Sequence, residues 1–339
     1  MNQQEAARQK RAVLVSFWLI LTCVAAILYS LHTGSIRLSP YQVLMTLLGY
    51  GSADDSLVLF AYRLPRIVIT MLAGVGLGIS GAILQGLYRN SLADPGVLGL
   101  HAGAAFGLVI FVSFFRSLEG MISLILPLFT FAGAVLAAIL IVLLAYDRHR
   151  GVMPIRLILV GIALAAGFSA VTLFLSLRLD EGTYAFAARW LAGNVWGREW
   201  ANVLALLPWI LLLVPYVISE AKVLDAFLLG EEVAIGIGTP VRRQRYVLLF
   251  AAVALASASV SMAGGVGFIG LAAPHLARRL VGPLHRYMLP ISGLIGLVIL
   301  VVADTIGRSI FQPNAIPAGV VVAAVGAPYF LYVLAKTKS

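Results

Sequence analysis

Two arginines stand at the start of a long apolar segment in this sequence. Arg63 and Arg66 flank a Leu-Pro pair in RLPR, and the apolar stretch 67–87 follows. A third arginine, Arg308, comes four residues after Asp304 near the end of another apolar stretch. Guanidinium groups at such a boundary can anchor a chain in lipid headgroups or pair with a carboxylate, and Asp304 is close enough in sequence to pair with Arg308. These side chains therefore suit contacts rather than covalent chemistry.

One pattern would suit covalent chemistry. The stretch GISG, residues 78–81, matches the G-x-S-G pattern of rhomboid-like intramembrane proteases, in which Ser80 would be the nucleophile and His275 the general base. Four small residues in a glycine-rich segment arise easily by chance, so this hypothesis is only an alternative. His101 and His275 have no second ligand three or four residues away, and Cys23 is the single cysteine, so the sequence predicts neither a metal site nor a disulfide.

The composition predicts an integral membrane protein that is all helical. Of 339 residues, 61% are hydrophobic and 11% are charged, and the mean hydropathy is +1.00. A membrane-spanning helix needs about 20 mostly apolar residues, and such runs recur along the chain. We expect a bundle of about ten, forming a single domain over 1–339, with spans at 13–31, 67–87, 97–115, 121–145, 153–177, 200–219, 246–263, 266–280, 287–303 and 316–335. The eighth is short and rich in Gly and Pro, which indicates a broken or partly re-entrant helix.

The charge pattern predicts that both ends of the chain are cytoplasmic. With ten spans and the basic segment 1–12 inside, 16 of the 24 Lys and Arg residues fall on the cytoplasmic side. The net charge of +10 then reflects membrane topology, and no basic and aromatic stripe suggests nucleic-acid binding. The expected location is the inner or plasma membrane.

Small residues recur at helical spacing and predict close helix packing. One stripe contains Gly74, Gly78, Ala82 and Gly86. Others contain Gly99, Gly103 and Gly107; Gly161, Ala165 and Ser169; and Gly319, Ala323 and Ala327. The Asp94-Pro95-Gly96 triplet predicts an N-cap with proline at the first position of the third span.

A source of energy is missing from the sequence. It contains no G-x-x-x-x-G-K-[ST] phosphate loop and no carboxylate pair deep in a span, so neither ATP hydrolysis nor the coupling of a secondary carrier is indicated. A transporter of this composition would take its energy from a partner. The inner segment 220–245 suits contact with such a partner. It contains leucines and isoleucines together with glycines, which leave the backbone accessible, and it ends with three arginines. An interfacial loop with basic anchors is the alternative.

An ordered set of motifs resembles the FecCD-type permeases from about residue 40 onward. The motifs are RLPR, NSLADPGVLGLHAGAAFG, WLAGNVWGREW, LGEEVAIGIG, GGVGFIGLAAPHLARRLVG and ADTIGRSI with IPAGVVVAAVGAPYFLYVL. The resemblance implies a type II ABC importer permease with ten helices, which works with a second permease, two ABC ATPase subunits that bind ATP and Mg²⁺, and an extracytoplasmic binding protein. The implied substrate is an iron–siderophore complex, with haem or cobalamin as alternatives. No cofactor on this chain is implied.

The resemblance also implies roles for particular residues. Arg63, Arg66 and Arg308 would dock acidic residues of the binding protein. The ATPase would receive a coupling element in which Ala234 and Gly236 lie closest to its groove, and whose residues are Leu228, Leu229, Gly230, Glu231, Glu232, Ala234, Ile235, Gly236 and Gly238.

Overall fold

The computed structural model describes residues 3–33, 36, 38–96, 98–115, 122–147, 151–152, 154–310 and 315–337. Ten helices of at least 13 residues within these ranges correspond in order to the ten expected spans: α1 (Gln3–His32), α4 (Leu64–Tyr88), α5 (Leu100–Phe114), α6 (Ile122–Ala145), α7 (Pro154–Ser176), α9 (Trp200–Ser219), α12 (Val241–Ala263), α13 (Ile269–Val281), α14 (His285–Ser309) and α15 (Ala318–Thr337). Seven of them are long and apolar enough to cross a membrane by themselves, α1, α4, α6, α7, α9, α12 and α14. The first residues of three expected spans, at 97, 121 and 153, lie outside the described residues.

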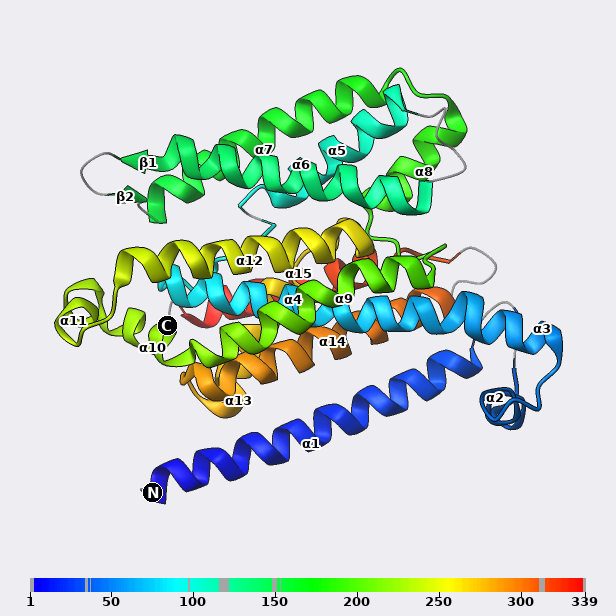
Figure 1. Ribbon diagram of the computed structural model, residues 1–339, viewed down its shortest axis with the longest axis horizontal. Helices are drawn as coiled ribbons and strands as arrows, with labels where there is room; N and C mark the ends of the chain where they lie inside the picture. Colours follow the sequence, from blue (N-terminus) through cyan, green and yellow to red (C-terminus); the bar gives the residue numbers. More distant parts are fainter. Residues whose placement is uncertain are drawn as a thin grey trace.

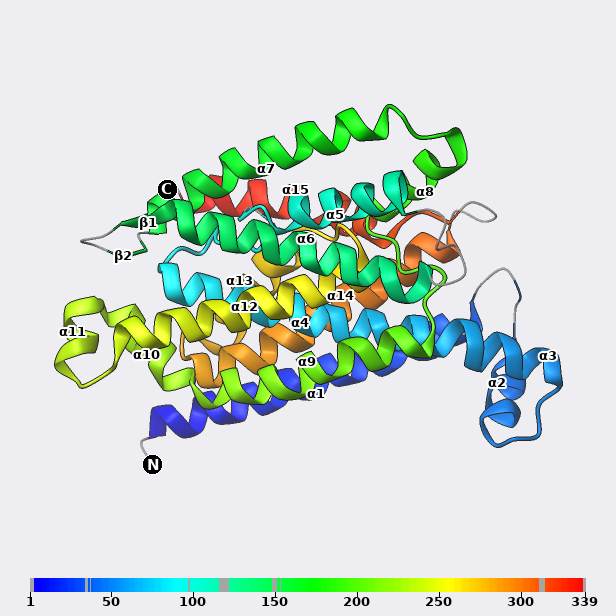
Figure 2. The same ribbon diagram turned by 45° about the horizontal axis from the view of Figure 1, so that its top comes forward.

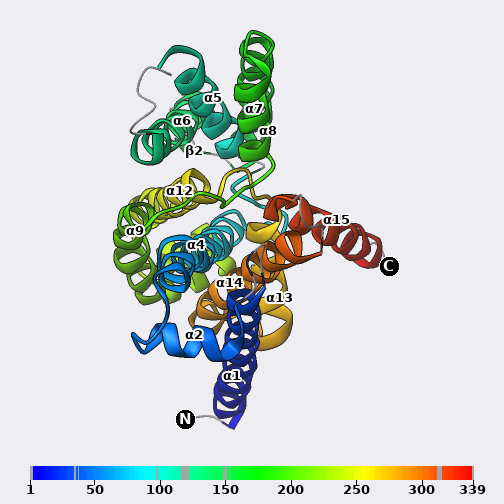
Figure 3. The same ribbon diagram turned by 90° about the vertical axis from the view of Figure 1, so that its right-hand side faces the viewer.

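Helix α4 lies in the middle of the bundle. Helices α9, α12, α13 and α14 surround it, whereas α1, α7 and α15 lie at the periphery (Figure 3). Helices α5, α6 and α7 form a second group that packs on this core mainly through α6 and α12 (Figure 1).

Glycines explain why α4 can occupy this position. A Cβ atom at Gly74 would lie 2.5 Å from the carbonyl oxygen of Gly296, and one at Gly78 would lie 2.3 Å from that of Ser292, so both glycines allow contact with the backbone of α14. Gly81 meets α13 more closely still, since its Cβ would lie 1.8 Å from the carbonyl oxygen of Gly270. The predicted stripe on α4 is therefore a packing surface.

Short elements cover the two ends of the bundle. At one end lie α10 (Ala221–Leu229), α11 (Glu231–Gly236), the hairpin of β1 (Tyr146–Asp147) and β2 (Gly151–Val152), and the N-terminus of α1; we call this the α11 end (Figure 2). At the other, the α2 end, lie α2 (Pro40–Leu47), α3 (Ala53–Ser56), the π-helix η1 (Leu57–Arg63) that continues into α4, and α8 (Glu181–Leu191). The C-terminal end of α15 points toward the α11 end, so both ends of the chain lie on the same side.

Two local expectations are tested by the fold. Helix α13 has 13 residues and contains Pro274, and at 1.5 Å per residue it is too short to cross the membrane, as expected for the eighth span. The N-cap prediction at Asp94 is wrong. Asp94 instead accepts the backbone N–H of Gly96 at 2.8 Å in a tight turn, and α5 begins later, after Gly99 in a left-handed conformation. The proline ring is thus part of the turn and not of the helix.

Candidate functional site

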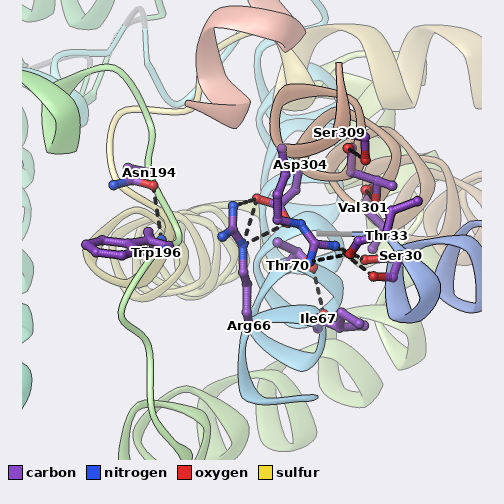
Figure 4. Close-up of polar contacts among 12 residues, drawn as sticks. Ser30, Thr33, Arg66, Ile67, Thr70, Asn194, Trp196, Val301, Asp304 and Ser309 are labelled. Atoms are coloured by element: carbon purple, nitrogen blue, oxygen red, sulfur yellow. Dashed lines mark hydrogen bonds and ion pairs between the residues drawn. The ribbon is translucent and has the colours of Figure 1, made fainter. Parts of the chain in front are cut away.

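The arginines of the RLPR motif meet α14 and α1 at the α2 end. Arg66 donates from Nε and Nη2 to both carboxylate oxygens of Asp304, with distances from 2.6 to 3.1 Å (Figure 4). Both side chains are buried, with 10% and 3% of their surfaces exposed. This bidentate ion pair joins the first turn of α4 to the last turns of α14. Asp304 therefore pairs with Arg66 and not with Arg308.

The other two arginines hold the C-terminal end of α1. Arg63 donates to the carbonyl oxygens of Leu31 and Ile36. Arg308 donates to the carbonyl oxygens of Ser30 at 3.0 Å and Thr33 at 3.2 Å, and these two residues lie beside the Arg66–Asp304 pair in Figure 4. The last carbonyls of a helix have no partners within it, and cations near them are stabilising.

The three predicted docking arginines thus form one cluster with Asp304, which we call the arginine cluster. Arg63 and Arg66 are buried, whereas Arg308 is half-buried. Three guanidinium groups and one carboxylate leave the cluster with a surplus of positive charge at the α2 end. Local patterns do not predict the inward orientation, because the acceptors come from distant segments.

The sequence analysis does not predict two further features of the α2 end. The π-helix η1 directly precedes the cluster, and Trp200 of α9 donates its indole N–H to the carbonyl oxygen of Phe60 in η1 at 2.8 Å. Such π-helical segments are rare and often occur at functional sites. Nearby in sequence, Arg198 is buried, and desolvation lowers its pKa to about 10. The Nε atom of Arg198 has no acceptor among the described residues.

At the opposite end, the predicted coupling element is divided between two helices, α10 and α11. Gly230, with φ of +109°, ends α10 and starts α11, and Gly238, with φ of +84°, follows α11. Leu228 and Leu229 therefore belong to α10, whereas Ala234 and Ile235 belong to α11. An ion pair between Glu231 and Arg245 at 2.7 Å holds α11 to the start of α12.

The exposed side of this element is apolar. Leu229, Val233, Ile235 and Ile237 have between 49% and 64% of their surfaces exposed, and Gly236 and Gly238 are exposed as well. We call these four side chains the coupling patch. Ala234 is fully buried, so the expectation that it lies closest to a partner's groove is wrong: it packs inward and supports the patch. Val233 and Ile237 belong to the patch but were not predicted.

The alternative chemistry finds no support in the geometry. Ser80 is fully buried and donates to the carbonyl oxygen of Ala252 at 2.7 Å, while the ring of His275 faces Tyr329. The hydroxyl of Ser80 is therefore bonded to the backbone and not to the imidazole of His275, whose Nε2 has no hydrogen-bond partner among the described residues. Within the part of the chain that the structure describes, no group of three or more His, Cys, Asp or Glu side chains is placed to hold a metal ion.

Comparisons with known proteins agree with this architecture. The model of the FecCD transport family matches residues 21–336. The iron(3+)-hydroxamate import system permease protein FhuG of Bacillus subtilis is 44% identical over 95% of this chain and 96% of its own length. The iron-uptake system permease protein FeuC of the same organism is 44% identical over 91% and 94%. A solved inward-facing structure of a metal-chelate type ABC transporter is 30% identical, with a TM-score of 0.82 over 94% of this chain and 98% of its own.

A bundle of helices long and apolar enough to cross a membrane, with an apolar patch at one end and a cationic cluster at the other, fits a multi-pass membrane permease. The chain belongs to the FecCD transport family. It is therefore the membrane subunit of an ABC importer and not an enzyme, and it works in a complex with an ATPase and a binding protein.

Proposed function

We propose that this permease carries ferric siderophore complexes across the cell membrane after an extracytoplasmic binding protein has delivered them. The observation that carries the proposal is the identity of 44% over nearly the whole chain with permeases named for iron(3+)-hydroxamate import and iron uptake. Haem or cobalamin is the alternative substrate within the same family.

The proposed assembly contains two permease subunits, identical or different, with the transport path between them. Helix α7 offers one surface for this contact, because it lies at the periphery and leaves Ile155, Leu159, Ile162 and Leu173 exposed. Lipid covers the remaining apolar surface. Two ABC ATPase subunits bind ATP and Mg²⁺, and this chain itself binds no cofactor.

The α11 end is proposed to be cytoplasmic, together with both termini. Segments 1–12 and 220–245 then lie inside the cell, in agreement with the excess of Lys and Arg on that side. The coupling patch faces the ATPase, where exposed apolar side chains can enter a groove as helical anchors. Around the patch, Leu228, Gly230, Glu231, Glu232, Gly236 and Gly238 complete the contact, and buried Ala234 supports it.

The arginine cluster is proposed to receive acidic residues of the binding protein on the outer side. Arg308 is half-buried and can meet a carboxylate directly, whereas Arg63 and Arg66 act through the surplus positive charge or after exchanging an internal partner. Charges of this kind raise the rate of encounter and fix the orientation of docking.

In the proposed cycle, ATP binding and hydrolysis in the partner move α10 and α11. This movement switches the path between outward and inward access, so the nucleotide state, rather than an ion gradient, sets the direction. Contacts with the chelate are weak and distributed, because a permease that bound it tightly would not release it.

Substrate uptake tests the proposal. Cells that lack this gene would be complemented with the wild-type chain and given radiolabelled iron as ferric hydroxamate or ferric citrate, and labelled haem or cobalamin in parallel. We expect the wild-type chain to restore uptake of a ferric chelate. Restoration of haem or cobalamin uptake alone would contradict the proposed substrate, and restoration of none would contradict the proposed function.

A further inference from the structure

A contact between α10 and α14 at the α11 end has no part in the proposed function so far. His285 is the first residue of α14, and Asp225 belongs to α10, next to the coupling patch. One carboxylate oxygen of Asp225, Oδ1, lies 2.9 Å from the backbone nitrogen of His285 and 2.7 Å from its ring atom Nδ1. The imidazole is completely buried.

Asp225 caps the N-terminus of α14, which has no capping side chain of its own. The N-cap position is Leu284, whose side chain cannot accept a hydrogen bond, and the first N–H groups of a helix have no partners within it. Asp225 accepts one of these N–H groups, and its negative charge lies at the positive end of the helix dipole. The start of α14 is thus capped by the coupling element.

The same imidazole also fixes the position of α4. A Cβ atom at Gly86 would lie 2.7 Å from Nε2 of His285 and 3.3 Å from Leu224 of α10. Only the absence of a side chain at position 86 lets the ring lie between the three helices. We call Asp225, His285 and Gly86 the joint.

From the joint, α4 and α14 run side by side to the arginine cluster. Backbone contacts at Gly74 with Gly296 and at Gly78 with Ser292 hold them together along their length. The ion pair of Arg66 with Asp304 fastens their other ends. Packed backbones joined at both ends move together as one rigid unit more easily than they slide past each other.

We propose that Asp225 and His285 are positioning residues that transmit movement of α10 to the α4–α14 pair, and through it to the arginine cluster. The proposal rests on the proposed function, because it assumes that an ATPase moves α10 and that the binding protein docks at the cluster. It names the specific contact by which events at one end of the molecule reach the other.

The test uses the complete transporter, with permease, ATPase and binding protein, in proteoliposomes supplied with ferric hydroxamate. Three quantities are measured: assembly of the complex, basal ATP hydrolysis, and the stimulation of hydrolysis by the loaded binding protein. The variants are Asp225→Ala, Asp225→Asn and Gly86→Ala. Asp54→Ala, which removes an exposed carboxylate far from the joint, is the matched control.

We expect Asp225→Ala and Gly86→Ala to assemble and to keep basal hydrolysis, but to lose stimulation at least about fivefold, the lower range of measured coupling between distant sites. Asp225→Asn should restore stimulation, since its amide oxygen still accepts both hydrogen bonds. Asp54→Ala should behave as the wild type.

Three results would overturn the proposal. Normal stimulation in both Asp225→Ala and Gly86→Ala would show that the joint transmits nothing. Loss of assembly in both would show a contact that serves only stability. If the wild-type transporter shows no stimulation with ferric hydroxamate, ferric citrate, haem or cobalamin, the proposed function fails and the joint fails with it.

Discussion

The charged residues of the arginine cluster have their hydrogen-bond partners inside the chain. The Arg66–Asp304 pair is buried, bidentate and remote in sequence, so each charge depends on the other for compensation. A buried pair of this kind contributes little beyond an apolar contact of the same shape, but removing one member leaves an uncompensated charge. Loss of Asp304 alone should therefore destabilise the protein more than replacement of both residues.

Asp304→Ala is expected to destabilise the protein by about 3–5 kcal/mol, because it leaves the Arg66 guanidinium buried without its carboxylate. The double change Arg66→Met with Asp304→Leu should recover most of this loss. Thermal unfolding of the detergent-solubilised protein measures both. An unchanged unfolding temperature in Asp304→Ala would mean that the pair is not formed.

In contrast to Arg66, which pairs with Asp304, Arg198 is a buried cation whose Nε atom lacks an acceptor among the described residues. Its pKa, lowered to about 10 by desolvation, still leaves it charged at neutral pH, so its burial opposes folding at every pH below that value. Arg198→Met keeps the volume and removes the charge. We expect it to raise the unfolding free energy of the isolated chain, because the desolvation of this charge is removed. A decrease would show that the guanidinium has a stabilising partner.

At the scale of elements, α10 and α11 present apolar side chains that a folded monomer normally covers. Leu229 and Ile235 are each more than half exposed, while buried Ala234 and the Glu231–Arg245 ion pair keep α11 in place. The surface is therefore already formed in the isolated chain, which favours the proposed contact with the ATPase.

Ile235→Glu is expected to weaken binding of the ATPase subunit by at least about 30-fold, which corresponds to the roughly 2 kcal/mol typical of a central contact residue. Ile310→Glu, an equally exposed isoleucine at the α2 end, is the matched control and should bind normally. Copurification of the ATPase with the permease measures the effect. Equal binding by both variants would exclude the coupling patch as the contact.

The close contact between α4 and α13 at Gly81 can be tested by substituting glycines. Gly81→Ala would place a methyl group on the backbone of α13, so we expect a marked fall in unfolding temperature. Gly167→Ala in α7 adds the same methyl group where no atom lies within 4 Å, and it should leave stability unchanged or slightly raised. Similar losses in both variants would contradict the observed contact between α4 and α13.

At the scale of the whole molecule, the order of the ten helices follows the runs of apolar residues in the sequence, and seven of these helices are long and apolar enough to span a membrane. The sequence also predicts the short α13, since Gly and Pro interrupt the apolar run there. It does not predict the orientation of the Arg63 and Arg66 side chains, because their acceptors lie in distant segments. Arg63 donates to carbonyl groups of α1 and of Ile36, and Arg66 pairs with Asp304 of α14. The sequence likewise does not predict that the coupling element is divided at Gly230, because this division depends on the positive φ of that residue.

The arrangement of the molecule places the two proposed partner contacts at opposite ends of one central helix pair. The arginine cluster lies where α4 begins and α14 ends, and the joint lies where α14 begins and α4 ends. Transport driven by ATP requires communication between these ends, whereas a carrier driven by an ion gradient requires a titratable or ion-binding group within the path.

The most direct test of the account is iron accumulation in sealed proteoliposomes that contain the permease, with or without its ATPase, under collapsed ion gradients. Loaded binding protein is added outside, and ATP with Mg²⁺ is enclosed inside. We predict that radiolabelled ferric hydroxamate accumulates only when ATPase and ATP are both present. Accumulation by the permease alone under an imposed proton or sodium gradient would contradict the account.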